Sequence, residues 1–140
     1  MKRLFNTQIQ EGNLNIALLI IRVAIGGMML AHGIPKLLML FGPEPLQFPG
    51  MFGMSPALTL GLAVFAEFLC SIFIIFGLWT RLASIPLIIT MVVAVFYVHV
   101  ADPFSSKELG LQYLMGYVVL LLLGSGKFSI DQLIGKGKIN

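Results

Sequence analysis

Four side chains capable of proton or charge chemistry stand inside or beside long apolar stretches of this 140-residue sequence. Arg22 and Glu67 each interrupt an apolar run, and His32 and His99 lie near the ends of two others. Imidazole changes charge near neutral pH, and a carboxylate in apolar surroundings binds a proton more readily than one in water. These residue types favour proton exchange with a bound molecule, and we expect Glu67, His32 and His99 to be the catalytic groups.

The elements that must position these residues are four apolar segments, each about 18 to 22 residues long, which is enough to cross a hydrocarbon core of roughly 30 Å. They cover residues 14–34, 57–78, 82–100 and 106–123, and an irregular loop at 35–56 joins the first two. No composition shift or repeat divides the chain. We therefore predict an all-α integral membrane protein, a four-helix bundle, formed by a single domain over residues 1–140.

Local signals indicate where the predicted helices begin and end. Pro35 is expected to end or kink the first span, because proline has no N–H and its ring clashes with the preceding turn. Ser55 is the expected N-cap of the second span, with Pro56 at its first helical position. Residues 105–108 (Ser-Ser-Lys-Glu) fit a capping box at the start of the fourth span, and Gly124 follows its end.

The composition favours a membrane location and excludes several classes of protein. The chain is 58% hydrophobic and 11% charged, with a mean hydropathy of +0.96. Soluble domains carry about 25% charged residues, so a very apolar soluble bundle is the disfavoured alternative. The nine Lys and Arg residues form no stripe with interleaved aromatic residues, and we expect no nucleic-acid partner. The single cysteine, Cys70, excludes an intrachain disulfide or dithiol site.

The basic residues indicate the orientation of the spans. Four crossings place both termini on one side, and short loops rich in Lys and Arg stay in the cytoplasm. That side carries Lys2, Arg3, Arg81, Lys127, Lys136 and Lys138. The other side carries only Lys36 and Lys107, so we predict an N-in, C-in topology. Arg81, on the inner side, is expected to bind lipid phosphate or to set the topology.

Arg22 and Glu67 are predicted to lie at similar depth. Counting about 1.5 Å per residue places them about 12 Å and 15 Å from opposite faces of the membrane. An isolated charge near the bilayer centre costs at least about 2.5 kcal/mol, so we predict an Arg22–Glu67 ion pair. The pair could be a packing lock, or Arg22 could hold Glu67 ready for proton exchange or ligand binding; the spacing leaves both readings open.

The same count places His32 and His99 near the outer surface, about 27 Å and 25 Å from the inner face. Lys36 follows His32 by one turn, and Asp102 follows His99 by three residues. We expect these groups to form an opening above the midplane pair. The predicted substrate-binding residues are Arg22, Lys36, Asp102, Tyr113 and Tyr117. The ordinary alternatives are that the histidines and tyrosines contact lipid headgroups and that Lys36 extends to the interface.

His32 and His99 could also ligate a haem, one from each of two helices at matched depth. No haem motif accompanies them, so haem is disfavoured. A metal site is not expected either, because only His32, His99 and Asp102 could contribute and their spacing matches no zinc signature.

Three stretches of the sequence resemble the DoxX family of small bacterial membrane proteins. They are "RVAIGGMMLAHGIPKL", "AEFLCSIFIIFGLWTRLASIPLIITMVVAVFYVHVADPF" and the closing "GSGKFSID". The resemblance covers residues 16–133, and its most specific positions include Arg22, His32, Lys36, Glu67, Arg81 and His99. It implies a multi-pass protein of the bacterial inner membrane, associated with quinol oxidase or thiosulfate:quinone oxidoreductase systems. Any electron carrier is then expected to be a bound quinone or to belong to a partner protein, since the chain has no flavin, iron–sulfur or dithiol motif.

Two functions from different classes follow. In the first, the protein is a membrane subunit of a quinone-linked redox system, works with a redox-protein partner, and exchanges protons at Glu67 and His32 or His99. In the second, it is non-enzymatic and binds or moves a lipid-like or small apolar molecule, or scaffolds partner proteins. The small residues Gly26 and Gly27 permit tight helix contacts, either within one chain or between the copies of a homo-oligomer.

Overall fold

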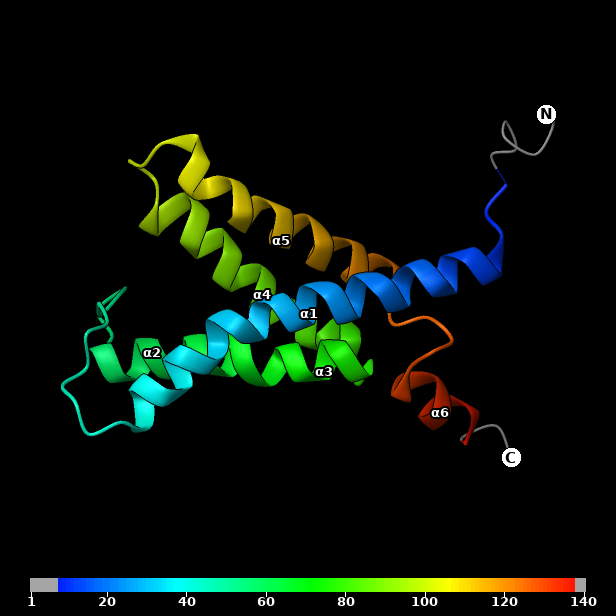
Figure 1. The fold of residues 1–140 in the computed structure, drawn as a ribbon, viewed down its shortest axis with the longest axis horizontal. Helices are drawn as coiled ribbons and strands as arrows, with labels where there is room; N and C mark the ends of the chain where they lie inside the picture. The colour runs from blue at the N-terminus through cyan, green and yellow to red at the C-terminus, as the bar shows by residue number, and fades with distance from the viewer. Residues whose placement is uncertain (1–7, 138–140) are drawn as a thin grey trace.

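The computed structural model describes residues 8–137, and every regular element in that range is a helix (Figure 1). Four helical stretches are long and apolar enough to span a membrane: Glu11–Phe41 (α1), Pro56–Phe76, Thr80–Val98 and Phe104–Leu123 (α5). The second consists of α2 (Pro56–Val64), η1 (Phe65–Cys70) and α3 (Ser71–Phe76), and the third of α4 (Thr80–Val93) and η2 (Ala94–Val98). A short helix, α6 (Ile130–Lys136), follows α5. The predicted all-α bundle with four spans is confirmed.

The four spans form two pairs that pack against each other. α1 packs on α2, η1 and α3, α4 packs on α5, and η1 also contacts α4. Figure 1 shows the pairs diverging towards the end that carries the α1–α2 and α4–α5 connections, which we call the open end. α1 begins, and α6 lies, at the opposite end, which we call the closed end.

A chain that crosses the membrane four times must begin and end on the same side. The start of α1 and α6 both lie at the closed end, in agreement with four crossings. The N-in, C-in orientation itself stays a prediction. Three of the basic residues on which it depends, Lys2, Arg3 and Lys138, lie outside the described residues.

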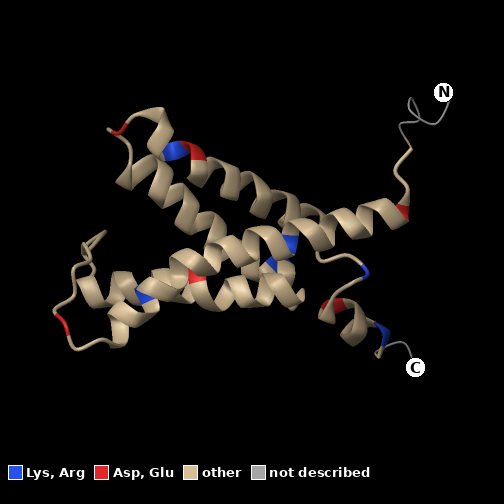
Figure 2. Cartoon of the chain, viewed as in Figure 1, with Lys and Arg blue, Asp and Glu red and all other residues tan. Residues whose placement is uncertain are grey.

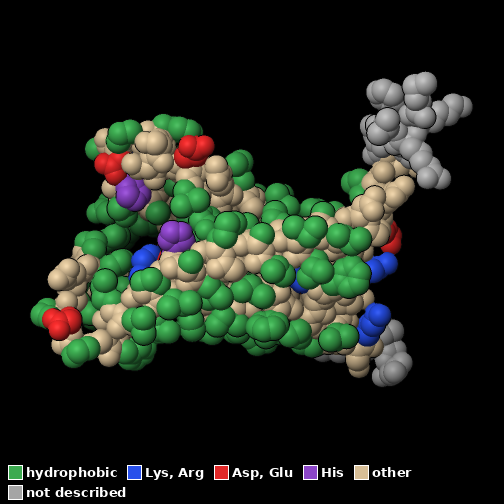
Figure 3. Space-filling view, viewed as in Figure 1, with side chains coloured by type: hydrophobic (Ala, Val, Ile, Leu, Met, Phe, Trp, Pro, Cys, Tyr) green, Lys and Arg blue, Asp and Glu red, His purple; other side chains and the backbone are tan. Residues whose placement is uncertain are grey.

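The outside of the bundle is suited to lipid. Figure 2 shows charged residues placed sparsely along the spans, and Figure 3 shows apolar side chains covering the visible face. Ile20, Leu82 and Leu122, on three different helices, are 63%, 63% and 70% exposed. A soluble monomer rarely exposes contiguous apolar surface on this scale. Arg22 and Glu67, in contrast, are buried inside.

α1 runs through Pro35 and ends at Phe41, so the predicted end of the first span at residue 34 is wrong. Proline removes one backbone hydrogen bond, but a span supported by neighbouring helices tolerates that loss. The loop before α2 shortens accordingly to residues 42–55. The extension lengthens α1 by about seven residues, or roughly 10 Å, and so changes which α1 side chains face which residues of the other spans.

The predicted caps are confirmed in part. The Ser55 hydroxyl accepts a hydrogen bond of 3.3 Å from the N–H three residues later, and Pro56 is the first residue of α2. α5 ends directly before Gly124, as predicted. The capping box at residues 105–108 is wrong, because α5 already begins at Phe104 and those residues form its first turn.

Two glycines let α1 approach the second span closely. A Cβ at Gly26 would lie 2.6 Å from Ile75 Cγ1, and a Cβ at Gly33 would lie 2.6 Å from the carbonyl oxygen of Glu67. Gly27, in contrast, has no neighbouring atom within 4 Å. The tight contact at Gly26 is therefore made within this chain, and backbone contact at Gly33 seats α1 against η1.

Two spans contain π-helical turns next to predicted site residues. η1 contains Glu67, and η2 ends directly before His99. A π turn holds one extra residue, so it rotates the side chains that follow relative to an α-helical register, and such turns are frequent at functional sites. Counting residues along an ideal helix does not anticipate this rotation.

Candidate ligand and proton site at the open end

The polar centre of the open end is an ion pair between Lys36 and Glu67. Lys36 Nζ lies 2.5 Å from each carboxylate oxygen of Glu67. The Glu67 side chain is 5% exposed and the Lys36 side chain 28%. Lys36 stands about one turn beyond Gly33, whose backbone contact with η1 sets how far apart the two side chains lie. A carboxylate this deep in an apolar bundle requires a compensating charge, and Lys36 supplies it.

The predicted Arg22–Glu67 ion pair is wrong. Arg22 instead binds the segment after α5: Nη1 donates to the carbonyl oxygen of Ser125 at 2.9 Å, and Nη2 donates to that of Phe128 at 2.5 Å. Arg22 is 1% exposed, and the carboxylate of Asp131 is near enough to attract it electrostatically. Arg22 therefore anchors the end of the chain rather than the acid at the open end.

The error comes from the register between α1 and the second span. Gly33 lies beside Glu67, whereas Arg22 lies beside Gly77. Glu67 and Gly77 are about ten residues apart, which separates Arg22 from Glu67 by roughly 15 Å along the helices. The depth count assumed that the first span ended at residue 34, and the additional turns of α1 past that point moved Lys36, not Arg22, to the level of Glu67.

Polar residues from α1, η1, α5 and the turn after η2 line one cavity at the open end, with a volume of about 190 Å³. Its polar lining consists of His32, Lys36, Glu67, His99, Ser106 and Tyr113. Figure 3 shows the two histidines and a basic side chain beside a hollow between the helix pairs. The structure thus brings five of the predicted site residues to one space. Arg22, Asp102 and Tyr117 are not among its lining residues.

A second, larger cavity of about 440 Å³ adjoins the same ion pair. Lys36, Glu67, Ala94 and His99 line both cavities. The rest of the larger lining is mostly apolar and includes Leu62, Ala63, Val93 and, from the loop at 42–55, Phe48, Met51 and Phe52. Small-molecule sites are typically about 300–1,000 Å³ with a few placed polar groups, and this cavity fits that description.

An aromatic contact holds the loop at 42–55 over the larger cavity. The rings of Phe52 and Tyr97 lie with their centroids 4.6 Å apart, which ties the loop to η2. Phe52 adopts a left-handed backbone conformation, with φ of 53°, which residues other than glycine rarely adopt. The loop therefore reaches η2 through an unusual turn at the residue that makes the contact.

Each histidine has a neighbour that orients its ring. His99 Nδ1 lies 2.6 Å from Asp102 Oδ2, and His32 packs edge-on against Tyr113 with ring centroids 6.0 Å apart. Because Nδ1 of His99 is directed at a carboxylate, Nε2 is the ring nitrogen available for exchange with a bound molecule. Asp102 thus contacts His99 and is not itself among the residues that line the cavity.

The two tyrosines of α5 lie at different depths. Tyr113 lines the smaller cavity, and Tyr117 stacks on it with centroids 6.2 Å apart. Tyr117 is fully buried among the core residues, beyond the two cavities. Of the two predicted tyrosines, Tyr113 therefore lines a cavity and Tyr117 lines neither of the two at the open end.

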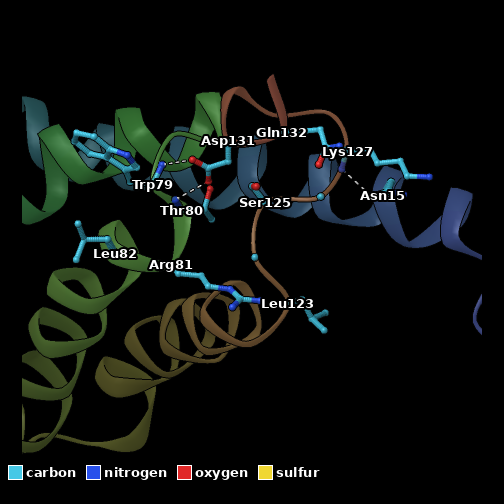
Figure 4. A pocket seen from close by; sticks show the side chains of 12 residues that line it. Asn15, Trp79, Thr80, Arg81, Leu82, Leu123, Ser125, Lys127, Asp131 and Gln132 are labelled. Atoms are coloured by element: carbon cyan, nitrogen blue, oxygen red, sulfur yellow. Dashed lines mark hydrogen bonds between the residues drawn. The ribbon is translucent and has the colours of Figure 1, made fainter. Parts of the chain in front are cut away.

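The closed end contains a polar cluster that the sequence analysis did not assign. The Asp131 carboxylate accepts hydrogen bonds from the backbone N–H of Trp79 at 2.6 Å and of Thr80 at 3.1 Å, so it caps α4 from a distant part of the chain (Figure 4). Asp131 N also donates to the carbonyl oxygen of Gly77 at 2.9 Å. The only signal in the sequence for this cluster was the closing "GSGKFSID" stretch, which contains Asp131. Its partners are backbone groups, and contacts to backbone groups leave no pattern of residue types.

The structure offers no protein cage for a metal within residues 8–137, where no group of three or more His, Cys, Asp or Glu side chains gathers. His32 and His99 do line the same cavity, which has a volume of about 190 Å³. That haem is disfavoured stays a prediction.

Four helices long and apolar enough to span a membrane form one bundle with a polar centre at one end, so the chain is a multi-pass helical membrane protein. The sequence model of the DoxX family, described as DoxX, matches residues 17–100. The chain belongs to this family, as the sequence resemblance indicated.

Three curated proteins are similar to this chain. A protein of Bacillus subtilis (strain 168) named "Putative oxidoreductase CatD" is 29% identical over 126 residues, covering 89% of this chain and 92% of the relative. An uncharacterized membrane protein of Mycobacterium tuberculosis is 31% identical over 134 residues, covering 83% and 80%. An uncharacterized protein of Haemophilus influenzae is 33% identical over 95 residues, covering 64% and 63%. No solved structure matches the chain significantly.

Proposed function

We propose that this DoxX-family protein is a membrane subunit of a quinone-linked redox system of the bacterial inner membrane and binds a quinone at the open end. The observation that carries the proposal is the Lys36–Glu67 ion pair, which borders both a mostly apolar cavity and a smaller polar one. The name of a similar protein, "Putative oxidoreductase CatD", supports a redox role.

The larger cavity is the proposed seat of the quinone. Its apolar walls suit the ring and its substituents, and Lys36 and His99 stand at the border with the polar cavity. An ammonium or imidazole N–H donated to a quinone oxygen stabilises the negative charge that this oxygen gains when the quinone is reduced. The oxygen would therefore face the ion pair.

The smaller cavity is the proposed proton route. Reduction of a quinone takes two electrons and two protons, and two O–H bonds form as the two C=O double bonds become single. In this proposal the electrons come from a redox-protein partner, since the sequence carries no flavin, iron–sulfur or dithiol motif. Glu67 and His99 border both cavities, so each can take a proton from the polar side and give it to a quinone oxygen; His32 and Tyr113 extend the route.

Binding can be tested directly with a soluble quinone analogue. The purified chain is titrated with decyl-ubiquinone by equilibrium dialysis, and the Lys36→Met and Glu67→Gln variants are compared with Glu108→Gln, which changes an exposed acid outside both cavities. Loss of a hydrogen bond to a charged group costs about 1.5–3 kcal/mol, so Lys36→Met is expected to weaken binding by about tenfold or more. Equal affinity in all variants contradicts this site.

The second candidate function is that of a non-enzymatic binder or carrier of a lipid-like molecule. The mostly apolar lining of the larger cavity favours it as well as it favours a quinone. Organic extraction of protein purified from native membranes, followed by mass spectrometry, separates the two. Quinone in near-stoichiometric amount supports the redox role, whereas phospholipid alone supports the carrier.

A further inference from the structure

A third cavity, of about 570 Å³, lies at the closed end, away from the quinone site. It is bordered by the start of α4, the end of α5, the segment after α5 and α6. Figure 4 shows Arg81 reaching from α4 towards the end of α5, with Lys127 and Asn15 across the opening. The cavity is therefore lined by side chains from parts of the sequence that are far apart.

The charges around this cavity leave one guanidinium without an acidic partner. The Asp131 carboxylate is bound by two backbone N–H groups and lies near buried Arg22. Lys127 Nζ lies 3.3 Å from Glu11, and both side chains are largely exposed. Arg81 makes one hydrogen bond, of 3.3 Å to the carbonyl oxygen of Leu122, and no carboxylate within residues 8–137 pairs with it.

Apolar side chains flank the cationic group. Trp79 and Leu82 line the cavity and are 58% and 63% exposed, and Leu123 lines it from α5. Trp side chains are enriched at the depth of lipid headgroups, and exposed Leu side chains contact acyl chains. The cavity thus combines a guanidinium that has no carboxylate partner among residues 8–137 with an apolar surface that leads into the hydrocarbon region.

We propose that this cavity binds the phosphate of an anionic phospholipid headgroup. Arg81 holds two phosphate oxygens through its remaining N–H donors, because a guanidinium matches phosphate geometry in bidentate fashion. Lys127 adds a second positive charge from the other side of the opening, and the acyl chains lie along Trp79, Leu82 and Leu123. Basic pockets between transmembrane helices are known to select anionic headgroups. This site is independent of the quinone proposal.

The test is native mass spectrometry of the purified full-length chain titrated with phosphatidylglycerol or phosphatidylcholine. The wild-type chain is expected to retain phosphatidylglycerol at least tenfold more tightly than phosphatidylcholine. Arg81→Gln is expected to remove most of this preference and Arg81→Lys part of it, whereas the matched change Lys136→Gln, on α6 and outside the cavity, leaves it intact.

An excess of inorganic phosphate distinguishes a lipid site from a site for free phosphate. No displacement of phosphatidylglycerol supports the lipid, and displacement by millimolar phosphate shows a free-anion site instead. Equal retention of the two lipids by the wild-type chain, or an Arg81→Gln variant as selective as the wild type, overturns the proposal. Circular dichroism of each variant confirms that the helices are intact.

Discussion

Gly33 and Glu67 touch through their backbones, although they lie on different spans. A Cβ on Gly33 would come within 2.6 Å of the Glu67 carbonyl oxygen and 2.8 Å of the next amide nitrogen. Backbone atoms cannot move aside as a flexible side chain can, so this contact fixes the separation of α1 and η1. It also fixes the position of Lys36, about one turn further along α1, over the buried carboxylate.

Gly33→Ala is therefore expected to lower the free energy of unfolding by roughly 1–3 kcal/mol, because the added methyl group forces the two helices apart. The control is Gly27→Ala on the same helix, where the new Cβ meets nothing within 4 Å. That change should leave stability unchanged or raise it by up to about 1 kcal/mol, because alanine favours the helix. Denaturation in detergent, followed by circular dichroism, measures both. Equal effects would contradict the contact.

The ion pair predicts unequal effects for its two partners. Lys36→Met leaves the buried Glu67 carboxylate without a compensating charge, which costs about 3 kcal/mol of stability. Glu67→Gln costs less, because Lys36 is 28% exposed and its ammonium can turn to water. The double variant is expected to recover most of the loss seen in Lys36→Met. Additive losses in the double variant, measured by the same denaturation, would show that the pair contributes nothing.

Arg22 is expected to hold the segment after α5 against the bundle. Arg22→Leu removes both hydrogen bonds to Ser125 and Phe128, so trypsin should cut after Lys127 several-fold faster than in the wild-type chain. The control is Arg81→Leu, which removes a guanidinium at the same end but none of those two bonds. Mass spectrometry of the fragments over time gives the rate. Identical rates in the wild type and Arg22→Leu rule out an anchoring role.

Asp102 is expected to affect proton exchange rather than folding. Asp102→Asn removes the charge that orients His99, and both side chains are more than 40% exposed, so stability should change by less than about 1 kcal/mol. If the quinone proposal holds, quinone-linked turnover with its partner should fall several-fold, because His99 loses the carboxylate that orients its ring. Turnover at the wild-type level in Asp102→Asn would contradict a positioning role for Asp102.

Residue counting predicted the gathering of polar groups at the open end. The count placed His32, His99 and Lys36 at one level, and these three residues line one cavity there. Asp102, which the count grouped with them, is not among its lining residues, whereas Glu67, which the count placed at the midplane, is. Lengths in residues are sufficient for this result, since an error of a few residues still leaves long side chains within reach of one another.

Predicting which side chains pair inside the bundle requires more than the lengths of the helices. Whether Glu67 meets Arg22 or Lys36 depends on register, and register depends on Pro35 lying inside α1 and on the contact at Gly33. Neither is visible in a count, because proline is an ordinary helix terminator in water. The carboxylate of Asp131 escaped prediction for another reason: its partners are backbone amides, and these are the same for every residue type.

The cap that Asp131 places on α4 also has a consequence for how the protein is made. The amides it binds belong to residues 79 and 80, about fifty positions earlier in the chain. A ribosome delivers the hairpin between the second and third spans to the membrane well before residue 131 leaves its exit tunnel. Until α6 has been synthesised, the two amides of that hairpin must therefore be hydrated or hydrogen-bonded to other groups. The cap on α4 is therefore completed only after the span that it caps and the span that follows have been made.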